Sequence, residues 1–372
     1  MGTELTRRGL MKLGGALSLA GAVSTPMQLF GGSKAAAAEE VTAVTWGGPL
    51  LKANEVIATD FTEKTGSSVL WELHEGGAAN ILSKIKATWP DSIKYDMVQA
   101  WDPVFYSMMN EGWLADVDDV VGLDEVAKPL VDKFRDKDGK AKIIPVATDG
   151  SYFGYRTDMV SKPITNMNDL LDPSLKGKIG LLDPSMYSFT PYVAMALELG
   201  GSEKDLEPAW EFMKKLAQSG NVAQILKSDV DTINALTTGS IAVSYTGIGN
   251  WGKIDKAAPI QLCNRVDGSK GLKSFLFTLG WAILNGPHAA TAKEFASYLI
   301  RADHDEFYAA NTTASPVNVK SKASPELEKF VLTSDADLQK YAYFPDFEYI
   351  SQNIGEWSKR FEVEIQPLVR QG

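Results

Sequence analysis

Strand and helix patterns alternate from residue 41 onward, and this alternation limits the chain to a small set of folds. The first extended run is β-branched, and the apolar residues after it recur with helical spacing. We expect strands at 41–45, 68–73 and 95–98, and helices at 50–64, 78–88 and from Asp102-Pro103 onward. Strands that are each followed by a helix build a mostly parallel sheet covered by helices, so the sequence predicts an α/β fold.

A change of pattern at residues 143–155 divides the chain. Two extended runs there flank Asp149-Gly150, and we interpret the segment as a crossing between two lobes. A strand at 275–284 is expected to return to the first lobe, followed by one long amphipathic helix at 289–310. We expect lobe 1 to comprise residues 41–147 and 277–320, and lobe 2 to comprise residues 148–276 and 321–372 with a C-terminal helical tail. Within lobe 2 we expect strands at 180–182, 222–226 and 241–245 and helices at 188–199, 203–218 and 229–237.

The first 38 residues have the parts of a cleavable export signal. The pair Arg7-Arg8 precedes a modest apolar run over 13–30, and small residues end the segment at Ala35–Ala38. The order of residues around the two arginines is similar to the twin-arginine export motif. We therefore expect cleavage near Ala38 and a protein located in the periplasm.

Charge and cysteine content exclude several classes of function. The whole chain has a formal net charge of −10, and the predicted leader is basic, so the remainder is more acidic still. An acidic surface disfavours nucleic acid and is compatible with a cationic solute. Cys263 is the single cysteine, which excludes an intramolecular disulfide and a Cys-based zinc site, and its apolar surroundings predict a buried thiol. No nucleophile elbow or zinc-protease motif is present, so we expect no catalytic residue, no metal and no cofactor.

Six short motifs together resemble one family. They occur in the order that is typical of bacterial extracellular solute-binding proteins, and they extend over nearly all of the chain after the leader. The motifs are Thr45–Gly48, Tyr95–Val98, Ile144–Val146 with Tyr152–Arg156, Leu171–Ile179, Gly239–Ala242, and Trp281–Asn285 with Ala292–Ala296. The branch that the chain resembles most is that of the spermidine/putrescine-binding proteins.

The resemblance implies a periplasmic-binding-protein-like fold of type II, with two α/β lobes, a hinge and a central ligand cleft. A protein of this kind closes its hinge on a small solute and delivers it to the permease subunits of an ABC importer in the inner membrane. The resemblance also implies a monomer. The expected solute is small, nitrogenous and cationic or zwitterionic, as a polyamine is; a phosphonate or another anion and ferric ion are the alternatives, and a periplasmic enzyme is a further one.

One stretch departs from the polyamine-binding pattern. That branch carries a tryptophan and an aspartate just before the returning strand, whereas this chain has Phe277–Trp281 there, without a carboxylate. Because an unpaired ammonium is costly to bury, a polyamine needs a carboxylate at each charged end. The departure leaves the identity of the solute open.

Ligands of open α/β sheets bind beyond the carboxyl ends of the strands, and this rule selects the candidate residues. Trp46, Gly47 and Gly48 at the end of the first strand are predicted to bind the ligand. The glycines allow close backbone approach, and the Trp46 ring is expected to stack on the ligand, with packing under the first helix as the alternative. Trp101 follows the third strand and is expected to line the cleft. For its neighbour Asp102, which precedes a proline, we favour a helix N-cap.

The remaining candidates come from the crossing segment and the second lobe. Each has an alternative in local structure: Asp149 in a turn, Asp183 and Ser185 at a cap, and Asp229 in the first turn of a helix beside Asp231. The predicted ligand-binding residues in this part of the chain are Asp149, Tyr152, Asp183, Ser185, Asp229, Tyr245 and Thr278.

Overall fold

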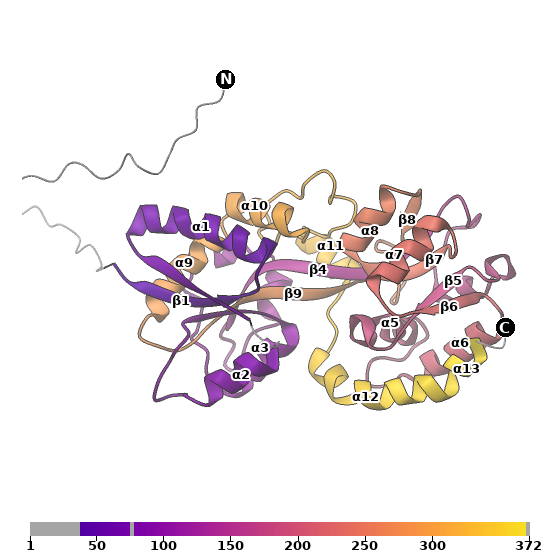
Figure 1. Ribbon diagram of the computed structural model, residues 1–372, viewed down its shortest axis with the longest axis horizontal. Coiled ribbons are helices and arrows are strands. Elements are labelled where there is room, and N and C mark those ends of the chain that lie inside the picture. Colours follow the sequence, from indigo (N-terminus) through magenta and orange to yellow (C-terminus); the bar gives the residue numbers. More distant parts are fainter. Residues whose placement is uncertain (1–37, 75–77, 370–372) are drawn as a thin grey trace, which may run out of the picture. The chain divides into compact units, whose positions relative to one another are not determined.

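The computed structural model describes residues 38–74 and 78–369 (Figure 1). Residues from Ala38 onward form a single unit by their contacts. The predicted twin-arginine leader lies outside the described residues, apart from Ala38. No helix in the described part is both long and apolar enough to cross a membrane.

A mixed β-sheet runs through the described residues, in the order β2-β1-β3-β9-β4-β7-β5-β6, with β10 paired to β9 and β8 to β4. At one end β1 is parallel to β2 and β3, and at the other β5 is parallel to β6 and β7, as the strand–helix alternation predicts. The strands are β1 (Glu40–Thr45), β2 (Ser68–Leu73), β3 (Met97–Trp101), β4 (Ile143–Arg156), β5 (Ile179–Leu182), β6 (Val222–Leu226), β7 (Val243–Gly247), β8 (Ile260–Leu262), β9 (Ser274–Ile283) and β10 (Ala342–Tyr343).

Two long antiparallel strands join the two ends of the sheet. β4 pairs with β9 from Ile143 opposite Ala282 to Ser151 opposite Phe275, with an irregularity between Pro145 and Ala147. Figure 1 shows this pair running between the two groups of helices. The predicted crossing strand and the predicted returning strand are therefore direct neighbours.

Helices cover the sheet and mostly occupy the predicted segments. α1 ends at Gly66, which has the left-handed backbone (φ 81°) that glycine adopts without strain. The helices are α1 (Pro49–Thr65), α2 (Ala78–Lys86), α3 (Asp102–Asn110), α4 (Lys128–Asp132), α5 (Thr190–Glu198), α6 (Glu207–Gln218), α7 (Asp229–Thr238), α8 (Ile248–Asp255), α9 (Ala289–Leu299), α10 (Ala302–Thr312), α11 (Asp335–Tyr341), α12 (Phe347–Glu364) and α13 (Gln366–Val369), with 3-10 turns η1 (Leu123–Glu125), η2 (Met167–Leu171), η3 (Pro173–Leu175) and η4 (Met186–Phe189).

Two local predictions are wrong, and one local alternative is excluded. The long helix expected at 289–310 is two helices, because Arg301 is extended (ψ 141°) and Asp303 and Asp305 begin a new first turn. Asp149-Gly150 is not a turn but continues β4. Asp102 is not an N-cap: Trp101 takes that position, and the Asp102 carboxylate accepts the backbone N–H of Thr278 in β9 instead.

The buried side chains gather at the two ends of the β4–β9 pair. We call the cluster that contains Phe61, Trp281 and Phe295 the first core, and the cluster that contains Tyr192 and Trp210 the second core. A smaller cluster around Phe105 and Phe134 adjoins β3. Cys263 is buried in the second core as predicted, and burial raises the pKa of its thiol to about 12.

The C-terminal segment contributes to both cores. Val331 packs in the second core and the next residue, Leu332, in the first. Ala342 then returns to the first core, while Phe347 and Phe361 pack in the second. The tail that the sequence places with lobe 2 thus follows the β4–β9 pair as a further connection between the two cores.

Candidate functional site

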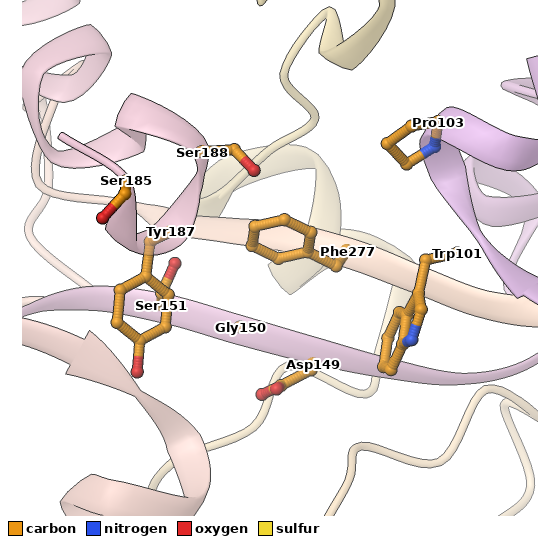
Figure 2. Close-up of a pocket in the computed structure, with 9 residues that line it drawn as sticks. All are labelled: Trp101, Pro103, Asp149, Gly150, Ser151, Ser185, Tyr187, Ser188 and Phe277. Atoms are coloured by element: carbon orange, nitrogen blue, oxygen red, sulfur yellow. The ribbon is translucent and has the colours of Figure 1, made fainter. Parts of the chain in front are cut away.

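A pocket of about 390 Å³ lies where β4 and β9 pass between the two cores. Figure 2 shows Trp101 and Tyr187 on opposite sides of it, with the Asp149 carboxylate between them. Its walls come from β3, α3, β4, η4 and β9, so elements of both cores contribute. The lining residues are Trp101, Pro103, Asp149, Gly150, Ser151, Ser185, Tyr187, Ser188 and Phe277.

Asp149 carries the strongest chemical feature of the pocket. Its Oδ1 atom is buried and has no hydrogen-bond partner. Burial raises the pKa of this carboxyl to about 6; the N–H groups of Gly150 and Ile248 oppose the shift, and the charge of Asp229 adds to it. A buried carboxylate oxygen without a donor is costly, so this atom is suited to receive a cation or an N–H group from a ligand.

Tyr187 forms the opposite wall on an unusual backbone. Tyr187, Ser188 and Phe189 have φ values of 51°, 49° and 64°, a left-handed run that costs non-glycine residues free energy. Phe189 is fully buried in the second core and anchors the end of the run. Such strain persists only where neighbouring contacts hold it, and here it sets one wall of a pocket.

The Tyr187 hydroxyl is held by four polar groups. It donates to Asp229 at 2.6 Å, accepts from the Gly247 N–H and the Asn250 amide at 3.0 Å each, and lies 3.0 Å from Thr246 Oγ1. These partners lie on α7, β7 and α8. Asp229 therefore acts on the pocket through Tyr187 and lies outside the lining itself.

Replacing Tyr187 with phenylalanine is expected to destabilise the fold by about 1–3 kcal/mol, because the Gly247 N–H and the Asn250 amide lose their shared acceptor. Urea unfolding measures the difference. Tyr341→Phe is the matched control, since its hydroxyl contacts only the exposed side chains of Asp267 and Lys340 among the described residues, and a loss below about 1 kcal/mol is expected. Equal losses in the two variants would contradict the role assigned to the Tyr187 hydroxyl.

The carboxyl ends of β1, β2 and β3 bring three aromatic rings together. The Trp46 ring lies 4.3 Å from that of His74 and 6.3 Å from that of Trp101, between centroids. His74 Nε2 lies 2.7 Å from the carbonyl of Gln99, and burial lowers the pKa of the imidazole. Trp46 packs against the first core beside Trp101 and, like Gly47 and Gly48, is not among the residues that line the pocket. Gly47 and Gly48 beside it are exposed, and Gly48 (φ 73°) is the N-cap of α1.

Three other predicted residues lie in the core and do not line the pocket. Tyr152 is fully buried and donates to the carbonyl of Phe330. The hydroxyl of buried Tyr245 donates to Thr190 and contacts Ser151. Thr278 is fully buried in β9. Of these, Tyr245 is connected to the pocket through Ser151.

Asp183 and Ser185 form a local turn, of which one residue lines the pocket. Asp183 Oδ1 accepts from the N–H and the hydroxyl of Ser185, at 3.0 and 2.6 Å. Of the two, Ser185 lines the pocket. The Asp183 carboxylate thus orients the loop that carries Ser185, although no side-chain cap hydrogen bond opens η4. The ligand-binding role of both residues stays a prediction.

Pocket residues that the sequence did not single out are Pro103, Gly150, Ser151, Tyr187, Ser188 and Phe277. Tyr187 falls just before a predicted helix, and no sequence pattern indicates its left-handed backbone. Ser151 was identifiable: side chains alternate along a strand, so Ser151 shares a face with Asp149.

The family of the chain follows from a match that extends through most of its length. Residues 57–336 match the model of the bacterial extracellular solute-binding proteins. The chain belongs to this family. Membership confirms the prediction of a binding protein that is not an enzyme. No curated protein matches the sequence.

Solved structures share the fold at low sequence identity. A putative extracellular solute-binding protein from Bordetella parapertussis has a TM-score of 0.71 at 16% identity, over 88% of this chain and 98% of that one. The spermidine/putrescine substrate-binding protein PotD from Streptococcus pneumoniae has 0.65 at 18%, over 89% and 100%. Iron-bound HitA from Pseudomonas aeruginosa has 0.61 at 18%, over 86% and 98%. The predicted type II periplasmic-binding-protein-like fold is thereby confirmed.

Proposed function

We propose that this solute-binding protein captures a small, cationic or zwitterionic nitrogenous solute in the pocket between its two cores. The buried, unpartnered Oδ1 of Asp149 is the observation that carries the proposal. The aromatic rings of Trp101, Tyr187 and Phe277 lie around that carboxylate, and aromatic faces attract ammonium groups. Three serines, at 151, 185 and 188, add hydroxyls for a polar part of the solute.

The alternatives have less support in the pocket. An anion such as a phosphonate would meet the carboxylate of Asp149 with like charge. For ferric ion, no group of three or more His, Cys, Asp or Glu residues within 38–74 and 78–369 is arranged to hold a metal. The structural relatives include both a polyamine-binding and an iron-bound protein, so their names favour neither class.

The proposal extends to the cellular setting. We propose a periplasmic monomer, exported by a twin-arginine-type leader cleaved near Ala38, that delivers the solute to the permease subunits of an ABC importer. The β4–β9 pair, with the C-terminal segment beside it, is the proposed hinge between lobes. We propose two lobes, one made of residues 41–147 and 277–320 and the other of residues 148–276 and 321–372. The C-terminal tail of the second proposed lobe also packs in the first core.

A ligand screen tests the proposed solute class. We expect one amine-bearing solute from a panel of polyamines, amino acids, opines and phosphonates to raise the melting temperature by several degrees. At a concentration of one hundred times Kd, binding to the folded state alone adds about 2.7 kcal/mol of stability. Stabilisation by phosphonates or ferric ion alone, without any amine, would contradict the proposed solute class.

A further inference from the structure

A buried ion pair, Asp102 with Lys133, lies next to residues that line the pocket. Asp102 is fully buried, and the side chain of its partner Lys133 is 10% exposed. Burial raises the pKa of Asp102 and lowers that of Lys133, and the attraction between the two charges opposes both shifts. Apolar residues often replace such pairs without loss of stability, so the presence of a buried pair is weak evidence that it stabilises the fold.

The Asp102 carboxylate fastens β9 to the first turn of α3. One oxygen pairs with the Lys133 ammonium, and the other accepts the backbone N–H of Thr278. Lys133 also donates to the Thr278 hydroxyl at 3.3 Å. Thr278 lies opposite Thr148 in β4, so the carboxylate holds β9 at the middle of the strand pair that joins the two cores.

Both residues joined by this hydrogen bond, Asp102 and Thr278, are chain neighbours of residues that line the pocket. Asp102 lies between Trp101 and Pro103 in the chain, and Thr278 follows Phe277; all three neighbours line the pocket. The Lys133 ammonium lies 4.7 Å from the centre of the Phe344 ring, in the segment that leads into α12.

The same segment also contacts a residue that lines the pocket. Phe347, at the start of α12, stacks on Phe277 with 4.5 Å between ring centroids and 28° between planes. The ion pair and this stack therefore connect three walls of the pocket with the C-terminal segment.

We propose that Asp102 is a positioning residue of the pocket, which sets Trp101, Pro103 and Phe277 through its hydrogen bond to Thr278, and that Lys133 is the counter-ion that makes this buried acceptor tolerable. The inference rests on the proposed pocket. It assigns Asp102 no contact with the solute.

Two double variants separate the hydrogen bond from the charges. Asp102→Asn with Lys133→Met removes both charges and keeps an acceptor for the Thr278 N–H. Asp102→Leu with Lys133→Met removes both charges and the acceptor, with a side chain of similar size. Two signals are read in the unliganded protein: hydrogen exchange of the Thr278 amide, and the ¹⁹F resonance of 5-fluorotryptophan at position 101, assigned with Trp101→Phe.

We expect the asparagine variant to keep both signals near those of the parent. In the leucine variant, Thr278 exchange should rise at least tenfold relative to the amides of β5, and the Trp101 resonance should shift or broaden. Should the leucine variant not fold, Asp102→Ala with Lys133→Met withdraws the acceptor with less bulk. Lys142→Met is the control: it removes ion pairs with Asp116 and Asp136, none of which lines the pocket, and both signals should stay unchanged.

Unchanged Thr278 exchange and an unchanged Trp101 resonance in the variants without an acceptor would overturn the inference. Faster exchange spread evenly over Thr278 and β5 would overturn it too, because that pattern reports global destabilisation. Since no solute is present, a failed ligand screen would refute the proposed solute class and leave these signals as they are.

Discussion

Solute binding is expected to weaken from about 30-fold to more than 1,000-fold when Asp149 is replaced by asparagine. Removing one partner of a buried charge pair costs about 2–5 kcal/mol, and each 1.4 kcal/mol is about a tenfold change in Kd. Asparagine keeps the size of the side chain and an oxygen for the nearby N–H groups of Gly150 and Ile248. The loss would therefore report the missing charge, and isothermal titration with the solute found by the screen measures it.

A matched control is available on the surface. Asp231→Asn makes the same chemical change at an exposed carboxylate of α7 that does not line the pocket, and its Kd should stay within about twofold of the parent. If both variants bound as tightly as the parent, the ammonium-binding role of Asp149 would have to be abandoned.

The pKa of Asp149 gives the same prediction a pH dependence. Its value of about 6 means that the carboxyl gains a proton as pH falls from 7 to 5, so affinity for a cation should decline over that range. The unliganded protein should behave in the opposite way. A folded-state pKa above the unfolded value of 3.8 contributes stability below about pH 4, and that contribution is lost as pH rises through 6. Asp149→Asn should remove both dependences.

Replacing Gly280 with alanine is expected to lower stability by about 1–3 kcal/mol or more, which is the second large effect. A Cβ at this position would lie 2.7 Å from the carbonyl oxygen of Ile144 and 3.0 Å from the Ile143 side chain. The backbone of β4 cannot yield without separating from β9. Because Asp149 and Phe277 lie on the same two strands, weaker solute binding should accompany the loss of stability.

Gly252→Ala is the control for the loss of stability. Gly252 lies inside α8, and a Cβ there would meet no atom within 4 Å, so a gain of up to about 1 kcal/mol is expected. Urea unfolding of both variants measures the contrast. A Gly280→Ala protein as stable as the Gly252→Ala protein would show that β4 and β9 do not need this close approach.

The architecture could be predicted from the sequence because strands and helices alternate with clear periods and end at glycines such as Gly66. The pocket could be predicted only in part. Trp101 and Ser185 follow the ends of strands, where a general rule places ligands, and both line the pocket. Asp149, on the crossing segment, also lines the pocket.

The remaining errors have a common physical cause, which is tertiary contact overriding local pattern. The position of Asp102 before a proline favours a local cap. Its carboxylate instead pairs with Lys133, 31 positions later, and accepts the backbone N–H of Thr278, 176 positions later. Along β4, successive side chains point to opposite faces, so the pocket position of Asp149 places Tyr152 in the core. The pattern could not show which face was which, because both neighbours of the strand are distant in sequence.

The second core is completed by residues of α12 and the position after it, and this has a consequence for the order of events in the cell. Phe361 and Ile365 are fully buried there, with the Phe361 ring 5.4 Å from that of Tyr192. At about 5–20 residues per second, synthesis from the predicted cleavage site to Ile365 takes roughly 15–65 s. The second core has to stay incomplete for all of that time. Export of a folded chain, as proposed for the twin-arginine-type leader, would therefore begin only after Phe361 and Ile365 have left the ribosome, whereas a route that threads the chain unfolded would have no such wait.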